Sequence, residues 1–269
     1  MAFRLGDIII DRVQYGLAEN TKGELLYILT QLADSSVEIT SESKDATDAN
    51  GTLIKRFYTA KAGTFTANNA MINTSILTAK AGVPAEIATD AKTIKMPKIL
   101  TVKVGEEVKL ENAVEGSVRL NAFYANGTMG TSEAETFAES ATAASETEFM
   151  VDYATGALTL PTLPDDSEIT QFVVKYDREV KDGIKILNSA DKFPSTVKLT
   201  LKALCVDPCT KDTLRACYIV MPSFQVSPDL SLSLTTDGQL EFSGDLQVDY
   251  CSADKSLFEF YLAADDEEE

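Results

Sequence analysis

Few residues in this sequence could perform catalysis. The chain contains no histidine, which is the commonest general base, and this excludes Ser-His-Asp and Cys-His mechanisms. Neither G-x-x-x-x-G-K-[ST] nor G-x-G-x-x-G occurs, so the familiar phosphate-binding loops are missing. The carboxylates of Asp165 and Asp166 could act as an acid and a base, but a chain with 42 Asp and Glu residues contains such neighbours by chance. The sequence therefore predicts no catalytic residue, no cofactor and no enzymatic activity.

Four cysteines could in principle bind a zinc ion as thiolates: Cys205, Cys209, Cys217 and Cys251. Their spacing, C-x₃-C-x₇-C with a distant fourth cysteine, lacks the paired C-x₂-C knuckles that bring sulfur atoms together. Cysteine is also often buried for packing alone. Buried free thiols are the favoured interpretation, and a metal site or a disulfide is the alternative.

The charge of the chain restricts its partners. A net charge of −18 argues against binding to a nucleic-acid backbone, because that affinity comes from Lys and Arg. An acidic surface still suits DNA that must pass without adhering, since like charges repel. The N-terminal stretch 1–16 is interrupted by Asp7 and Asp11 and resembles neither a signal peptide nor a membrane span. We expect synthesis in a cytoplasm, reduced thiols and no membrane contact.

The clearest structural pattern lies between Leu230 and Tyr250. Apolar residues occupy even positions there and polar residues the odd ones, which is the period of a half-buried strand. Asp237-Gly238 fits a two-residue turn, so we expect a β-hairpin. The polar face of its second strand carries acids and no base: Glu241, Asp245 and Asp249.

A second hairpin is expected near the N-terminus. Residues 37–40 and 53–59 alternate, and the polar stretch between them predicts a loop longer than a hairpin needs. Loops of this length often carry function. The candidate contact residues in it are Ser41, Glu42, Lys44, Asp45, Asp48, Asn50 and Gly51.

One amphipathic helix is expected from Ala67 to Lys80. Ile72, Ile76 and Leu77 have helical spacing, with Thr66 as a candidate N-cap and Gly82 as the stop. A further strand is expected from Val197 to Cys205. Residues 24–32 fit either a helix or a strand, and the strand is favoured. The last five residues, all acidic, are expected to be disordered until something holds them.

Three segments follow from these patterns. Residues 1–95 and 182–269 read as one β-domain, with a small β-domain inserted at 96–181. In the insert, the small and acidic tract Thr131–Glu148 is expected to be a solvated loop or a flexible arm.

Two stretches resemble tail tube proteins of tailed bacteriophages: VEITSESKDATDANGTLIKRFYTAKAGTFTANNAMIN and MPSFQVSPDLSLSLTTDGQLEFSGDLQVDYC. The resemblance rests on the order of strand, long polar loop, strand and helix, and it covers roughly residues 20–80 and 185–262. It implies an antiparallel β-sandwich or barrel-type domain with a flanking helix. It also implies six copies per ring and stacked rings that form a virion tail tube for genome ejection. Extra domains on such proteins are often immunoglobulin-like and face outward.

The resemblance gives the polar residues their expected roles. Glu241, Asp245 and Asp249 would line the channel, which DNA passes without specific binding, and the Ser41–Gly51 loop would contact the next ring. Partners would be further copies of the chain and other tail proteins such as a sheath, baseplate or terminator. The alternatives are a capsid decoration protein, a host-surface adhesive module and an enzyme, and for the acids a merely solvated strand face.

Overall fold

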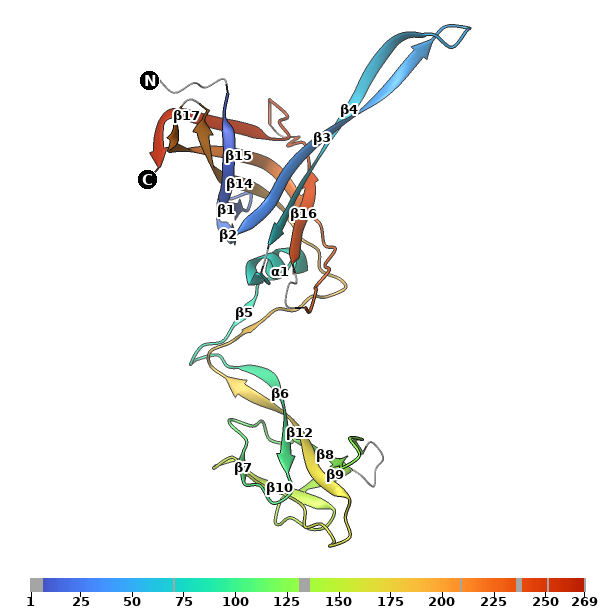
Figure 1. The fold of residues 1–269 in the computed structure, drawn as a ribbon, viewed down its shortest axis with the longest axis vertical. Helices are drawn as coiled ribbons and strands as arrows, with labels where there is room; N and C mark the ends of the chain where they lie inside the picture. The colour runs from blue at the N-terminus through green and yellow to red at the C-terminus, as the bar shows by residue number, and fades with distance from the viewer. Residues whose placement is uncertain are drawn as a thin grey trace. The chain divides into compact units, whose positions relative to one another are not determined.

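A computed structural model of the chain describes residues 7–69, 71–130, 136–208, 210–235, 239–250 and 252–268. The chain forms two compact units (Figure 1). The larger unit comprises residues 1–85 and 186–269, and the smaller unit comprises residues 86–185, which include the expected insert at 96–181. The described residues are mainly β with one short helix, so the predicted fold class is confirmed.

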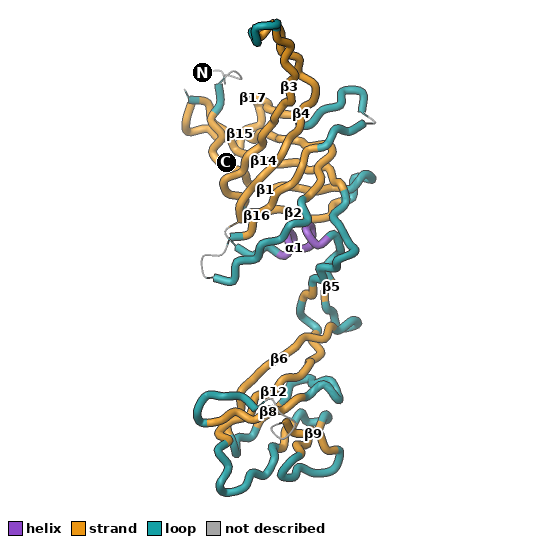
Figure 2. The backbone as a smooth tube through the Cα atoms, turned by 90° about the vertical axis from the view of Figure 1, so that its right-hand side faces the viewer, coloured by secondary structure: helices purple, strands orange, loops and turns teal. Residues whose placement is uncertain are grey.

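The larger unit contains one antiparallel sheet of eight strands in the order β2-β1-β14-β15-β16-β4-β3 (Figure 2). The eighth strand, β17, pairs with residues 214–220 of β15, while residues 224–226 of β15 pair with β16. The bounds are Ile9–Glu19 (β1), Leu25–Thr30 (β2), Leu32–Thr47 (β3), Leu53–Asn69 (β4), Thr196–Asp207 (β14), Thr210–Val226 (β15), Leu240–Leu246 (β16) and Glu259–Glu268 (β17).

Beside a smaller cluster on β14 and β15, the strands of this sheet bury side chains in one main core. Its centre is a group of three phenylalanines, in which Phe65 meets Phe224 and Phe242 edge-on at centroid distances of 6.0 and 6.2 Å. The quadrupoles of the aromatic rings favour such edge-on contacts. Gly244 permits the close pairing of β15 and β16, because a Cβ there would lie 2.4 Å from the Gln225 carbonyl oxygen and 2.5 Å from the Phe224 ring.

The helix is shorter than the sequence predicted. Helix α1 is Thr74–Ala81, capped by the Asn73 side chain, which accepts a hydrogen bond from the Ser75 N–H at 2.8 Å. It ends at Gly82, which has the left-handed φ of 67°. The predicted start at Ala67 was wrong because residues 67–69 belong to β4 and pair with β16. Ile76 is fully buried in the core.

Two predictions about the C-terminal part were also wrong. Leu230–Leu234 form no strand, and β16 pairs with β4 and β15 instead of with them. The predicted Asp237-Gly238 turn lies outside the described residues. Of the acidic tail, residues 265–268 belong to β17, whose backbone pairs with Leu214 and Arg215 of β15, so they are not disordered.

The smaller unit has a seven-stranded sheet in the order β6-β12-β8-β9-β10-β11-β7, which curves around its own core, and a two-stranded pair, β5-β13. The bounds are Glu86–Ile87 (β5), Ile94–Lys103 (β6), Val108–Lys109 (β7), Arg119–Tyr124 (β8), Thr136–Ser140 (β9), Glu148–Asp152 (β10), Ala157–Thr159 (β11), Ile169–Val180 (β12) and Ile184–Lys185 (β13).

The acidic tract of the smaller unit is partly structured. Residues 136–140 form strand β9, which pairs with β8 and β10, and the Phe137 ring packs edge-on against Phe172 at 5.4 Å. The prediction of a loop or flexible arm over the whole tract Thr131–Glu148 was therefore wrong for β9. Residues 131–135 lie outside the described part.

Candidate functional site

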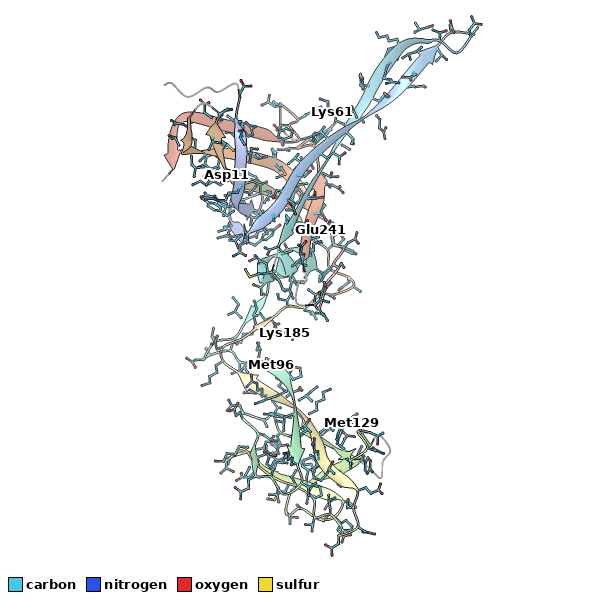
Figure 3. All side chains as sticks on the ribbon, in the orientation of Figure 1. Asp11, Lys61, Met96, Met129, Lys185 and Glu241 are labelled. Carbon is cyan, nitrogen blue, oxygen red and sulfur yellow. The ribbon has the colours of Figure 1, made fainter. Side chains whose placement is uncertain are left out.

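Strands β3 and β4 continue beyond the core as a two-stranded arm, defined here as residues 41–61 (Figure 1). No residue of this arm is buried, and Figure 3 shows side chains on both sides of the ribbon beyond Lys61. The predicted long loop was wrong: Ser41, Glu42, Lys44 and Asp45 lie in β3, and the turn is confined to residues 48–52. A strand with two exposed faces shows no alternation of apolar and polar residues, so the sequence pattern could not indicate these strands.

The turn at the end of the arm is organised by Asp48. Its Oδ1 accepts hydrogen bonds from the backbone N–H of Asn50 at 2.9 Å and of Thr52 at 2.8 Å. These bonds, chiefly the one from Thr52, hold the pKa of the Asp48 carboxyl below its usual value. Gly51 adopts a left-handed φ of 82°, which glycine tolerates without strain. Of the predicted contact residues, Asp48, Asn50 and Gly51 therefore form one tight turn.

The strands of the arm combine an ion pair with uncovered apolar side chains. Arg56 donates two hydrogen bonds to the Asp45 carboxylate, at 2.7 and 2.9 Å, and lowers its pKa. The large apolar residues nearby are solvent-exposed, Ile54 by 69% and Tyr58 by 71%. Leu53 and Phe57 are about half exposed. An apolar surface on a projecting element is typical of a contact with another molecule.

The arm also differs in charge from the chain as a whole. It contains three acids and four bases and so carries a net charge of +1, whereas the whole chain carries −18. The bases are Lys44, Lys55, Arg56 and Lys61. The arm therefore lacks the acidic excess of the rest of the chain, and charge repulsion does not oppose its contact with an acidic surface.

An acidic face lies on β16 and the strands beside it. Leu240, Phe242 and Leu246 are buried, while Glu241 and Asp245 are exposed on the opposite face. Asp245 is registered between Thr64 of β4 and Gln225 of β15, and Thr64 is registered with Glu38 of β3. Glu38 thus shares this face, which the sequence could not reveal because only the pairing of β3 with β4 brings it there.

Asp249 does not belong to this face. It follows the end of β16, is half-buried, and lines a separate pocket of about 790 Å³ with Glu19, Lys198 and Glu259. The three predicted acids are therefore split: the structure brings Glu241 and Asp245 together on one strand and places Asp249 outside it.

Lys80 joins the helix to the segment before β16. Its Nζ donates a hydrogen bond to the Asp229 carbonyl oxygen at 2.6 Å, and the residue is nearly inaccessible to solvent. Burial lowers the pKa of Lys80, while the nearby charges of Glu241 and Asp229 oppose that shift. The charge of Lys80 thus partly compensates that of Glu241 at one end of the acidic face.

Two of the cysteines are buried and free. Cys205 on β14 and Cys217 on β15 hydrogen-bond to each other, and burial raises the pKa of the Cys217 thiol to about 12. Cys209 and Cys251 lie outside the described residues. Among the residues that the structure describes, no group of three or more His, Cys, Asp or Glu side chains could hold a metal ion. No described helix has the length and hydropathy to cross a membrane.

The sequence model of the YomU/Tube protein family matches residues 7–256, which is nearly the whole chain and includes the smaller unit and most of the larger one. No curated protein matches the chain.

Proposed function

The chain belongs to the YomU/Tube protein family, a family of phage tail tube proteins, and we propose that six copies form a ring and that rings stack into the tube that conducts DNA during ejection. Such a protein acts by its geometry, and the family is structural rather than enzymatic. The proposal places the protein in the virion tail, assembled with further copies of itself and with other tail components.

The observation that carries the proposal is the arm. A hairpin without a core beneath it is stabilised only by its cross-strand pairs, and two-stranded ribbons are marginal in water. This one exposes Leu53, Ile54, Phe57 and Tyr58, which gain stability only when another surface covers them. Its net charge of +1 matches the acidic remainder of a second copy. We assign the arm, including all seven predicted contact residues, to the contact between successive rings.

The acidic face has a role in the same scheme. Around a six-fold axis, Glu38, Glu241 and Asp245 would repeat as bands of negative charge, and such a surface repels phosphates instead of binding them. We assign Glu241 and Asp245 to the wall of the channel, with Glu38 beside them. Asp249 was proposed for the same wall, and its position beyond the strand makes it the weakest of the three predicted lining residues.

The test removes the arm without disturbing the core. Thr40 and Ala62 are registered partners, so residues 41–61 can be replaced by an Asn-Gly turn that joins them. By electron microscopy we expect the unaltered protein to form tubes and the shortened protein to form single rings. A control variant exchanges Lys103 for Gln, at an exposed position of the smaller unit outside the arm, and should still form tubes. Long tubes from the shortened protein would exclude the arm from the contact, and the absence of rings and tubes from the unaltered protein would exclude the function.

A further inference from the structure

The segment Leu230–Leu234 has the sequence of a strand but no strand partner. Its LSLSL pattern alternates strictly, as half-buried strands do. In the structure it lies outside any helix or strand, and every residue from 228 to 235 is exposed. Leu230 and Leu232 are about two-fifths exposed, and Leu234 is exposed by 83%. Three exposed leucines in a segment outside any strand are costly to leave in water.

Strand β2 offers the complementary surface. It lies at the end of the sheet, and among the described strands only β1 pairs with it. Edge strands are usually protected by Lys, Pro or short length, but residues 25–30 contain neither Lys nor Pro. Leu26 and Ile28 point away from the core and are each more than two-fifths exposed. The Thr30 carbonyl oxygen at its end accepts a hydrogen bond from the Asn69 side chain, and residues 25–29 leave an edge to which a further strand can add.

On the core side of β2, a buried hydroxyl has no hydrogen-bond partner among the described residues. It belongs to Tyr27, whose side chain points toward the core. Tyr27 lines a pocket of about 240 Å³ together with Leu26, Ala79 of α1, Pro194 and Val197. An unpaired buried hydroxyl is unfavourable, so a polar group arriving beside Tyr27 would be stabilising.

We propose that Leu230–Leu234 of one copy adds as a strand to the free edge of β2 of the neighbouring copy. The leucines then lie beside Leu26 and Ile28, and the serines between them face the side on which the Tyr27 hydroxyl lies. Backbone hydrogen bonds fix the alignment, as in other cases of strand addition. Charge does not oppose the contact, because neither Leu230–Leu234 nor β2 contains a charged residue although a quarter of the chain is charged.

The donor and the acceptor are different surfaces of the same chain. Such an interface is head-to-tail, and it closes into a ring when the rotation between copies divides a full turn. The proposal thus rests on the proposed function and specifies the contact within a ring, which is separate from the contact between rings assigned to the arm.

The test uses two variants that each disable one side. Leu232→Lys removes the donor and Ile28→Lys removes the acceptor, while Ile99→Lys, at an exposed apolar position of the smaller unit, controls for the added charge. By light scattering after size exclusion we expect each of the first two variants to lose self-association and Ile99→Lys to retain it. An equimolar mixture of Leu232→Lys and Ile28→Lys should form a dimer that does not grow, because one donor and one acceptor remain intact.

The possible results separate this inference from the function. Tubes formed by Leu232→Lys or Ile28→Lys, or a mixture that stays monomeric, would overturn the strand addition and leave the tube function standing. A wild-type chain that never associates would overturn both. If a lysine variant unfolds at a lower temperature than the wild type, the triple change of Leu230, Leu232 and Leu234 to Ser serves as donor variant, since these residues are already exposed.

Discussion

Ile76 fixes α1 to the core of the larger unit. It is fully buried among residues of several strands, and Leu77 packs beside it. Ile72, which the sequence places on the same helical stripe, precedes the helix and is exposed by 51%. The two isoleucines are four positions apart in sequence but occupy different environments.

Truncating each isoleucine to alanine should distinguish the buried site from the exposed one. We expect Ile76→Ala to lower the free energy of unfolding by about 2–5 kcal/mol, because it leaves a cavity in a packed core. Ile72→Ala should lower it by less than about 0.5 kcal/mol, as exposed substitutions do. Denaturant unfolding of both variants measures the difference, and equal losses would contradict the observed start of the helix.

Asp48 makes the turn of the arm sensitive to acid. Its carboxyl pKa is lowered in the folded state by backbone N–H donors, so its contribution to stability is complete above the unfolded value of 3.8. This contribution is lost as the pH falls through the lowered folded pKa. We expect the amide resonances of Asn50 and Thr52 to move together on acidification, with a midpoint below 3.8, and Asp48→Asn to abolish that titration. A midpoint at or above 3.8 would show that the carboxylate does not accept these bonds.

At the scale of elements, the sequence predicted a strand where one face is buried. The segments at 24–32 and 197–205, and the second half of the C-terminal hairpin, correspond to β2, β14 and β16. Alternation of apolar and polar residues indicates an apolar face but not the partner that covers it. The predicted strand at Leu230–Leu234 was therefore wrong. Asn73 was a readable helix-cap signal, because Asn is a favoured N-cap residue. The cap at Asn73, and not the apolar spacing from Ala67 onward, sets the start of the helix.

The acidic face can be tested as an element. Replacing Glu241 and Asp245 with Lys together should leave the fold intact, since both side chains are exposed. In a channel wall the two lysines would bind phosphates, so we expect DNA release from assembled virions to slow at low salt and to recover as salt is added. Asp249→Lys is the control for added charge and should have a smaller effect. Unchanged release at low salt from the double variant would mean that this face is only solvated.

At the scale of the whole molecule, the smaller unit begins and ends with two segments of the chain, β5 and β13, that pair with each other. Glu86 and Lys185 are registered partners in the β5-β13 pair and form an ion pair of 3.8 Å. The residues before and after the unit, Ala85 and Ile186, are therefore close enough for a short bridge. The unit has its own core, separate from that of the larger unit. We propose that it faces outward on the tube, as the resemblance implied for the insert.

Removing the smaller unit tests that placement. A chain in which a short Gly-Ser bridge replaces residues 86–185 should fold and assemble, because no strand of the larger sheet is lost. By electron microscopy we expect a tube of smaller outer diameter and unchanged channel. A chain that folds but builds no tube would show that the unit takes part in assembly.

The exposed apolar side chains of the arm have a thermal consequence. Covering Leu53, Ile54, Phe57 and Tyr58 lowers the heat capacity of the system, and near room temperature the gain comes from the entropy of released water. That gain weakens on cooling. The enthalpy of stacking should therefore become more negative as temperature rises, a slope that calorimetry at several temperatures measures. Tubes built in this way are expected to be cold-labile, with rings that separate in the cold and rejoin on warming.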